Sequence, residues 1–236
     1  MISTTCEACK FKVSLEGTQI GCQLDLLERF KESGAEITTR TTEGETSFVI
    51  NRVCQSRRNK DWKGDIYSEI FIPITIVVTY NGSPKDLKQS LYCIRHLSAP
   101  KRPRVIVCHG VKDSEVVSEI IKDDKSSSIT RIMIVEELYT DASRDEAFKR
   151  CKNGWVLFTK SGEHLEPETL EILNFAINYR MGTFVAVSGL ECFMAVVYKY
   201  LRGQMGGSIF DKLKELGDDS IADWSDLEED YRLFYE

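Results

Sequence analysis

The sequence predicts an α/β protein with a mainly parallel sheet flanked by helices, preceded by a small cysteine-rich module. From residue 73 onward, short runs of β-branched residues alternate with amphipathic stretches, which is typical of parallel strands joined by helices. The first quarter of the chain is weakly patterned and contains four of the eight cysteines. The apolar fraction of 42% is sufficient for a core, and no apolar run approaches the length of a membrane span.

The predicted elements follow in chain order. A helix is expected at Gln23–Ser33, where Gly34 is a stop signal, and a strand at Ser47–Val53. Further strands are expected at Ile74–Thr79, Arg104–Cys108, Arg131–Val135, Trp155–Thr159 and Thr183–Val187. The helices expected between them are Pro84–Leu97, Ser114–Lys122, Ser143–Cys151 and Pro167–Tyr179.

Residues that typically begin or end helices support these assignments. Ser83 followed by Pro84 is a suitable N-cap and first-turn pair. A last helix is expected to end with Leu213–Leu216. The domain limits that follow are 1–65 for the cysteine module, 70–216 for the α/β domain and 217–236 for an acidic tail.

Charge is spread unevenly along the chain. The formal net charge is −6, and residues 217–236 contain eight acids and one base, so this tail carries −7 and the remainder about +1. An overall basic surface for nucleic acid is therefore lacking, and only Arg52–Lys63 is locally basic. The tail also carries apolar residues at helical spacing, so we expect it to dock on its own domain or on a protein partner: Trp224, Leu227, Tyr231 and Phe234.

The N-terminal cysteines are spaced like metal ligands. Cys6 and Cys9 are separated by two residues, which lets both sulfurs turn onto one ion, and Cys22 and Cys54 would complete a tetrahedral zinc site. Such an ion would fold a segment that is poor in apolar residues, and a closed site would leave no position for catalysis. Two alternatives remain open, namely that only Cys6 and Cys9 lie close, as free thiols, or that the thiols hold an iron–sulfur cluster.

The other cysteines suggest no chemistry. Cys93, Cys108, Cys151 and Cys192 lie in apolar or helical surroundings, where cysteine behaves as a small hydrophobe. Cys108 and His109 are neighbours on a strand and point to opposite faces, so they do not form a nucleophile–base pair. The N-terminus has no basic or apolar start, which predicts a cytoplasmic protein.

Polar residues gather where the predicted strands end, which is where open α/β sheets bind ligands. The first strand ends in Thr79-Tyr80-Asn81, the second is followed by Gly110 and Asp113, and the fourth runs into Thr159-Lys160-Ser161-Gly162-Glu163. Arg144 opens the helix before the fourth strand. In this order, the segment 73–190 resembles the family-2 glycosyltransferases of the GT-A fold.

The resemblance implies a nucleotide-sugar site. Four residues would contact the nucleotide: Thr79, Tyr80, Asn81 and Asp113. Arg144 and Lys160 would contact the diphosphate, and Glu163 or Glu191 would serve the acceptor or a metal as catalytic residues. For Glu191 the alternative is a position on a helix surface.

The resemblance also reveals replaced acids. In the family, a D-x-D motif after the fourth strand holds Mn²⁺ or Mg²⁺, whereas this chain has Lys160 and Gly162 in place of the first two acids and keeps only Glu163. The acidic pair after the second strand is replaced by Cys108 and His109. Because a hard dication needs a compact set of oxygen ligands, these replacements argue against Mn²⁺ or Mg²⁺.

Two classes of function remain open. The first is a glycosyltransferase-like protein with an altered nucleotide-sugar site, either metal-independent or inactive, in which Lys160 neutralises the diphosphate. The second is a non-catalytic structural or adaptor protein that uses the cysteine module and the tail as partner surfaces. A third hypothesis, a nucleic-acid-binding zinc protein, depends on the basic segment Arg52–Lys63 alone, which a solvated basic loop also explains.

The cysteine module carries a second resemblance. Cys6-x2-Cys9-x-Phe11, followed by Cys22, Cys54 and Trp62, resembles the leaders of glycosyltransferase-like proteins of tailed phages. That resemblance implies a protein of the host cytoplasm or a virion component.

Overall fold

The structure is a computed structural model of the 236-residue chain. It describes residues 4–7, 9, 12–22, 26–52, 54, 72–99, 102–124, 129–134, 140–151, 154–180, 184–187, 190–202, 209–216 and 221–222. The tail helix, most of the basic segment and the predicted boundary between residues 65 and 70 lie outside these residues. In the described ranges, no helix is long and apolar enough to cross a membrane.

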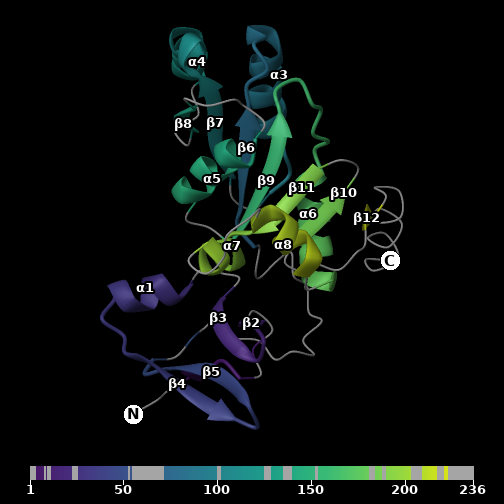
Figure 1. Ribbon diagram of the computed structural model, residues 1–236. Helices are drawn as coiled ribbons and strands as arrows, with labels where there is room; N and C mark the ends of the chain where they lie inside the picture. Colours follow the sequence, from purple (N-terminus) through teal and green to yellow (C-terminus); the bar gives the residue numbers. More distant parts are fainter. Residues whose placement is uncertain are drawn as a thin grey trace.

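A five-stranded sheet occupies the N-terminal part of the chain (Figure 1). Its strands are β1 (Thr4–Thr5), β2 (Lys12–Leu15), β3 (Thr18–Cys22), β4 (Ile37–Thr42) and β5 (Glu45–Ile50), and helix α1 (Leu26–Glu32) follows β3. The order is β1-β5-β3-β2, with β4 paired to β5. Only the helix and the last strand were predicted, because the other strands are short and polar and bury few residues.

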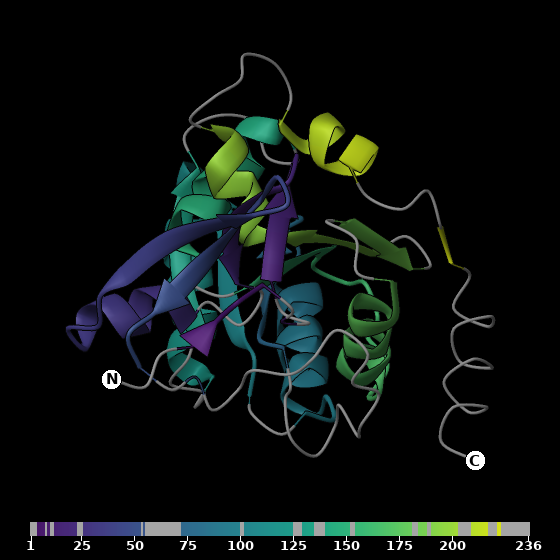
Figure 2. The same ribbon diagram turned by 90° about the horizontal axis from the view of Figure 1, so that it is seen from below.

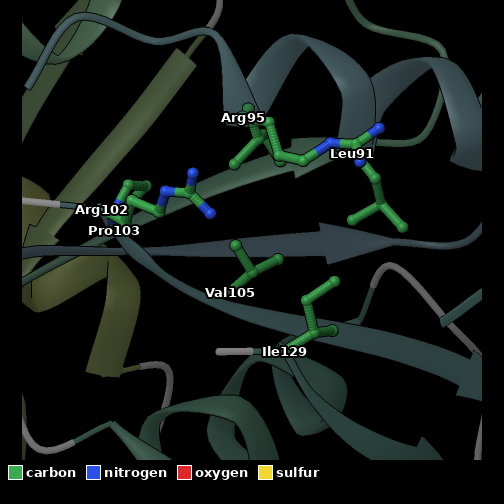
Figure 3. A pocket seen from close by; sticks show the side chains of 7 residues that line it. Leu91, Arg95, Arg102, Pro103, Val105 and Ile129 are labelled. Carbon is green, nitrogen blue, oxygen red and sulfur yellow. The ribbon is translucent and has the colours of Figure 1, made fainter. Parts of the chain in front are cut away.

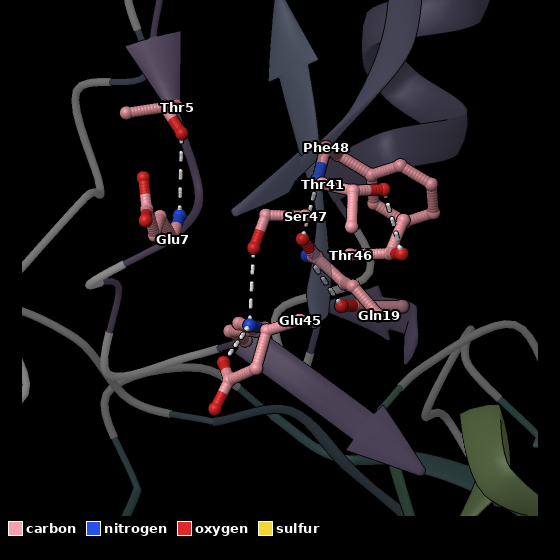
Figure 4. Close-up of polar contacts among 10 residues, drawn as sticks. Thr5, Glu7, Gln19, Thr41, Glu45, Thr46, Ser47 and Phe48 are labelled. Atoms are coloured by element: carbon pink, nitrogen blue, oxygen red, sulfur yellow. Dashed lines mark hydrogen bonds and ion pairs between the residues drawn. The ribbon is translucent and has the colours of Figure 1, made fainter. Parts of the chain in front are cut away.

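Two tight turns and a buried amide organise this sheet. Positive φ angles at Glu16 and Gly17, and again at Glu43 and Gly44, form the two-residue connections that favour antiparallel hairpins. The buried Gln19 accepts a 2.7 Å hydrogen bond from the Phe48 N–H, as Figure 4 shows. This side chain links β3 to β5, whose own parallel pairing is limited to Thr18 opposite Thr46.

The second sheet is seven-stranded, in the order β12-β10-β11-β9-β6-β7-β8. Its strands are β6 (Ile74–Thr79), β7 (Arg104–Gly110), β8 (Ile129–Ile134), β9 (Trp155–Lys160), β10 (Phe184–Val187), β11 (Leu190–Met194) and β12 (Ile221–Ala222). The helices are α3 (Pro84–Arg95), α4 (Ser114–Asp123), α5 (Asp141–Arg150), α6 (Thr169–Arg180), α7 (Ala195–Arg202) and α8 (Ile209–Leu216), with a 3-10 turn at Val111–Asp113. Figure 2 shows α3 and α6 on one side of this sheet and α7 and α8 on the other.

The sheet is mixed: four of its six strand pairings are parallel, and the prediction of a mainly parallel sheet is corrected at β11. Strands β8, β7, β6 and β9 are parallel as predicted, whereas β11 runs antiparallel to both β9 and β10. Only residues 188 and 189 separate β10 from β11, and so short a connection cannot make a parallel crossover. The sequence does not predict β11, because the predicted sheet ends with the strand at Thr183–Val187.

Apolar strands and an aromatic cluster form the core. Residues Ile74–Val78 of β6 are all buried, as expected for a central strand covered on both faces. Ser83 accepts a hydrogen bond from the Asp86 N–H, so the predicted N-cap of α3 is confirmed. The aromatic cluster between the sheet, α5, α7 and α8 comprises Phe148, Phe158, Phe193, Tyr198 and Phe210.

The N-terminal sheet packs on the second part of the fold through helix α7. Val13 of β2 belongs to the main core cluster, and Gly21 of β3 lies against Val196 of α7. A Cβ atom added at Gly21 would lie 2.2 Å from the Val196 Cγ1. The glycine is therefore required by close approach of the two elements.

We predict that Gly21→Ala lowers the free energy of unfolding by about 1–3 kcal/mol, because the stiff Val196 side chain has to move. Urea denaturation measures the change. Adding Val196→Ala makes room and should restore part of the loss. A fully stable Gly21→Ala protein would contradict the packing of β3 on α7.

Candidate functional site

An open cleft of about 270 Å³ lies where β6 and β9 end. It is lined by Thr79, Ser143, Arg144, Phe158, Thr159, Lys160, Glu163 and Glu191. Five of the predicted site residues are therefore brought together: Thr79, Arg144, Lys160, Glu163 and Glu191. Ser143, Phe158 and Thr159 were not predicted, although Ser143 and Thr159 immediately adjoin predicted residues and Phe158 lies two positions before Lys160.

Strand pairing accounts for this convergence. In the parallel pairing of β6 with β9, Thr79 lies opposite Lys160, so the polar ends of both strands meet at one edge. In the antiparallel pairing of β11 with β9, Glu191 lies opposite Phe158. Arg144 enters from the first turn of α5, which is capped by the Thr140 side chain.

Glu191 lies between two cations. Its Oε1 accepts a 2.6 Å hydrogen bond from the Lys214 Nζ, and its Oε2 lies 2.8 Å from the Arg144 Nη2. The second contact lacks hydrogen-bond geometry and is an ion pair by distance. Glu191 lies on β11, so the alternative of a helix surface is wrong. Lys214, on α8, had no sequence signal because nothing near it in the chain suggests a site.

The Arg144 guanidinium lies over two aromatic rings. Its Cζ lies 5.4 Å from the ring centroid of Phe158 and 5.5 Å from that of Phe210. Cation–π attraction and the ion pair with Glu191 together restrict the orientation of its donor fork. The cleft therefore offers a preoriented arginine, and Lys160 at the end of β9 adds a second positive charge.

Glu163 is turned back onto its own loop. Its Oε2 accepts a 2.8 Å hydrogen bond from the Thr159 hydroxyl and a 2.7 Å bond from the Lys160 N–H. These bonds close the turn after β9. The remaining acid of the resembled motif thus supports the loop that carries Lys160.

Gly162 cannot be replaced by an acid without strain. Its φ is +95°, and a Cβ atom there would lie 3.2 Å from the Asp86 carboxylate. Its N–H donates a 2.9 Å hydrogen bond to the Ser90 hydroxyl, which ties the loop to α3. A second carboxylate at this position would face Asp86 directly, so the loop is built for glycine.

Three predicted nucleotide contacts lie outside the cleft lining. Tyr80 is 2% exposed, and burial, followed by the charges of Asp113 and Asp86, raises the pKa of its hydroxyl. Asn81 organises the turn, donating 2.8 Å hydrogen bonds to the Asp86 carboxylate and to the Ser161 carbonyl. Asp113 ends the 3-10 turn and directly precedes α4.

The cysteines separate into two groups. Cys108, Cys151 and Cys192 are buried, and burial raises the pKa of Cys108 and of Cys151 to about 12, which makes both poor nucleophiles at neutral pH. Cys6 and Cys22 pack against Cys9. Among the described residues, no group of three or more His, Cys, Asp or Glu side chains is placed to hold a metal ion.

A second hollow is too small for a ligand. It lies between α3 and the starts of β7 and β8, and the side chains of Leu91, Arg95, Arg102, Val105 and Ile129 surround it (Figure 3). Its volume of about 20 Å³ corresponds to roughly one water molecule. The cleft at the ends of β6 and β9 is therefore the better candidate site.

No family model and no curated protein matches the chain. Among solved structures, residues 1–349 of TarS from S. aureus match with a TM-score of 0.52 and 14% identity, over 66% of this chain and 58% of that one. The mannosyltransferase PcManGT from Pyrobaculum calidifontis, solved with GDP-Man and Mn²⁺, matches with a TM-score of 0.49 and 14% identity, over 62% and 53%. The chain thus spans little more than half of either solved chain.

The class defined by the fold is therefore a GT-A-like α/β protein. At 14% identity the likeness to TarS concerns the fold alone.

We predict that Gly162→Asp lowers the free energy of unfolding by more than Gly162→Ala. The alanine variant measures the backbone strain, about 1–3 kcal/mol for a non-glycine residue held at this φ, and aspartate adds repulsion from Asp86. Urea denaturation with and without Mn²⁺ measures both. Stabilisation of Gly162→Asp by Mn²⁺ would contradict the view that this loop cannot accept a metal-binding acid.

A second prediction concerns alkaline pH. Burial raises the pKa of the Cys108 thiol from 9.0 in the unfolded chain to about 12 in the folded chain. Unfolding therefore releases a proton between these pH values, and stability falls as the pH rises through this window. Each such thiol contributes a slope of about 1.4 kcal/mol per pH unit. Cys108→Ala should therefore flatten the stability curve between these pH values. The control is Cys93→Ala, at a half-buried position, and an unchanged slope in Cys108→Ala would contradict the prediction.

Proposed function

We propose that the chain is a glycosyltransferase-like protein that binds the diphosphate of a nucleotide sugar without a divalent metal. The observation that carries the proposal is the pair of cations, Arg144 and Lys160, in one cleft at the strand ends. Arginine suits this role because its planar fork can bind two phosphate oxygens at once, and lysine adds a point charge. Thr79 and Ser143 add hydroxyl groups to the same lining.

The structural neighbours support a nucleotide-sugar ligand. TarS has been solved with UDP and with UDP-GlcNAc, and PcManGT with GDP-Man and Mn²⁺. This chain differs from a metal-dependent arrangement at the loop after β9, where Gly162 is constrained against Asp86. Positive side chains would then neutralise the diphosphate in place of the ion.

Glu191 is the better of the two candidate bases. Transfer to an acceptor hydroxyl needs a carboxylate that takes up its proton. Glu191 reaches the cleft from a paired strand and is kept in place by Arg144 and Lys214, whereas Glu163 is occupied by the turn after β9. Arg144 would therefore both position this base and bind phosphate.

The alternative function is that of a non-catalytic structural or adaptor protein, such as a phage virion component. One observation favours it, namely that Arg144 and Lys214 are both already paired within the chain with Glu191, which offsets one of their two charges. In that case the N-terminal four-cysteine module, with a structural zinc ion, and the acidic tail would serve as partner surfaces. The fold would then act as a scaffold.

Calorimetric titration with UDP, GDP and their sugar conjugates, with and without Mn²⁺, tests the proposal. We expect binding that is independent of Mn²⁺ and weakened at least about tenfold in Lys160→Ala, because a hydrogen bond to a charged group contributes roughly 1.5–3 kcal/mol. Lys122→Ala is the matched control, since this exposed lysine lies in the last turn of α4, away from the cleft.

The other outcomes are equally informative. Binding that requires Mn²⁺ would contradict the metal-independent mechanism. The absence of binding at millimolar nucleotide would contradict the enzyme hypothesis and favour the adaptor.

A further inference from the structure

The four N-terminal cysteines lie toward one end of the five-stranded sheet. Cys22 is the last residue of β3 and lies opposite Lys12, the first residue of β2. Cys9 precedes β2 in the chain, and its carbonyl accepts a 3.1 Å hydrogen bond from the Lys12 N–H. Cys9 therefore lies just beyond the end of the sheet at which Cys22 ends β3. Because β5 runs parallel to β3, the chain leaves β5 at Ile50 toward the same end, and Cys54 follows four residues later.

The Cys-x2-Cys segment forms a closed turn. The Cys9 N–H donates a 3.0 Å hydrogen bond to the Cys6 carbonyl, and the Cys6 N–H donates a 2.9 Å bond to the Phe48 carbonyl of β5. This turn fixes the backbone of both cysteines relative to the sheet. Reorientation of their sulfurs then requires rotation of side chains alone.

The sulfurs also form a small core of their own. Cys9 is 8% exposed, and Cys6 and Cys22 are the partly buried residues packed against it, in a cluster separate from the main core. Within the described part of residues 4–54, the buried side chains are few: Cys9, Val13, Gln19, Ala35, Ser47 and Ile50. Two of these are polar, and Val13 belongs to the main core.

The sheet therefore gains little stability from apolar burial of its own and depends partly on its packing against α7 and the main core. Small units with this deficit use disulfides or a structural metal. Free thiols that pack as hydrophobes add little, whereas four thiolates on one ion contribute folding free energy directly. The cysteines lie at the end of the sheet where such a link would join β1, β3 and the segment after β5.

We propose that Cys6, Cys9, Cys22 and Cys54 bind one structural zinc ion that closes this end of the N-terminal sheet. Thiolates are soft ligands that suit zinc, and four of them fill its tetrahedral shell. Three of the thiols already pack together without forming a ligand group among the described residues, so their side chains must rotate to bind the ion. Each thiol also loses its proton to the solvent as the metal is bound. The ion is structural, because the shell has no open position, and it is independent of the nucleotide proposal.

The wild-type chain, purified under reducing conditions with zinc in the growth medium, provides the first test. Elemental analysis should find about one zinc per chain. Stepwise mercurial modification of the thiols, with a chromogenic chelator present, should release this zinc as the four module cysteines react. Replacement of zinc by Co²⁺ should produce the intense near-ultraviolet bands of cobalt–thiolate bonds.

Variants separate the site from general effects of cysteine loss. Cys22→Ser should lose most of the bound zinc, whereas Cys93→Ser, on α3, should retain it. Chelation of the metal from wild type should lower Tm by roughly 10 °C, since the ion contributes several kcal/mol to folding. Chelation should leave the Tm of Cys22→Ser unchanged.

Three results would overturn the proposal. They are a reduced protein that binds neither zinc nor Co²⁺, an iron-containing chromophore in place of zinc, and retention of zinc by Cys22→Ser. Failure here leaves the nucleotide titration unaffected, because Lys160 and Arg144 lie on the other sheet and its helices.

Discussion

The parallel pairing of β6 with β9 is the constraint on which the cleft depends. The register runs from Ile74 opposite Trp155 to Thr79 opposite Lys160, and every residue between is buried, all of them apolar except Thr75 and Thr159. A shift of one residue would turn these side chains to the wrong face, so burial holds the register. Because both strands point the same way, their polar ends meet at one edge, and β11 brings Glu191 beside them.

Charge, more than shape, distinguishes this cleft. Arg144 and Lys214 pair with Glu191, and Lys160 and Glu163 belong to the same lining as Arg144 and Glu191, so the cleft holds charges of both signs. The ion pairs position Arg144 above Phe158 and Phe210, which is preorganisation of the kind that anion recognition requires. The same pairs mean that an incoming diphosphate competes with Glu191 for its cations. Affinity would therefore depend on how far the phosphate oxygens replace the carboxylate.

Much of the second sheet could be predicted because its signals are local. The bounds of β6 were predicted without error, and those of β7, β9 and α3 to within two residues. Five of the predicted site residues line the cleft, while Tyr80 is buried and Asn81 holds a turn. Strand ends were recognisable, but which of their side chains face the cleft depends on turn geometry. The metal assignment for the N-terminal cysteines remains a prediction.

The sequence by itself determined the alternation of strands and helices after residue 73, the cap at Ser83 and the replacement of acids by Lys160 and Gly162. These features depend on periodicity and residue identity within a few positions. Tertiary structure decided the antiparallel β11, the polar N-terminal sheet and the placement of Glu191 between Arg144 and Lys214. Each of these depends on partners distant in the chain, and short polar strands gain their stability only from such pairing.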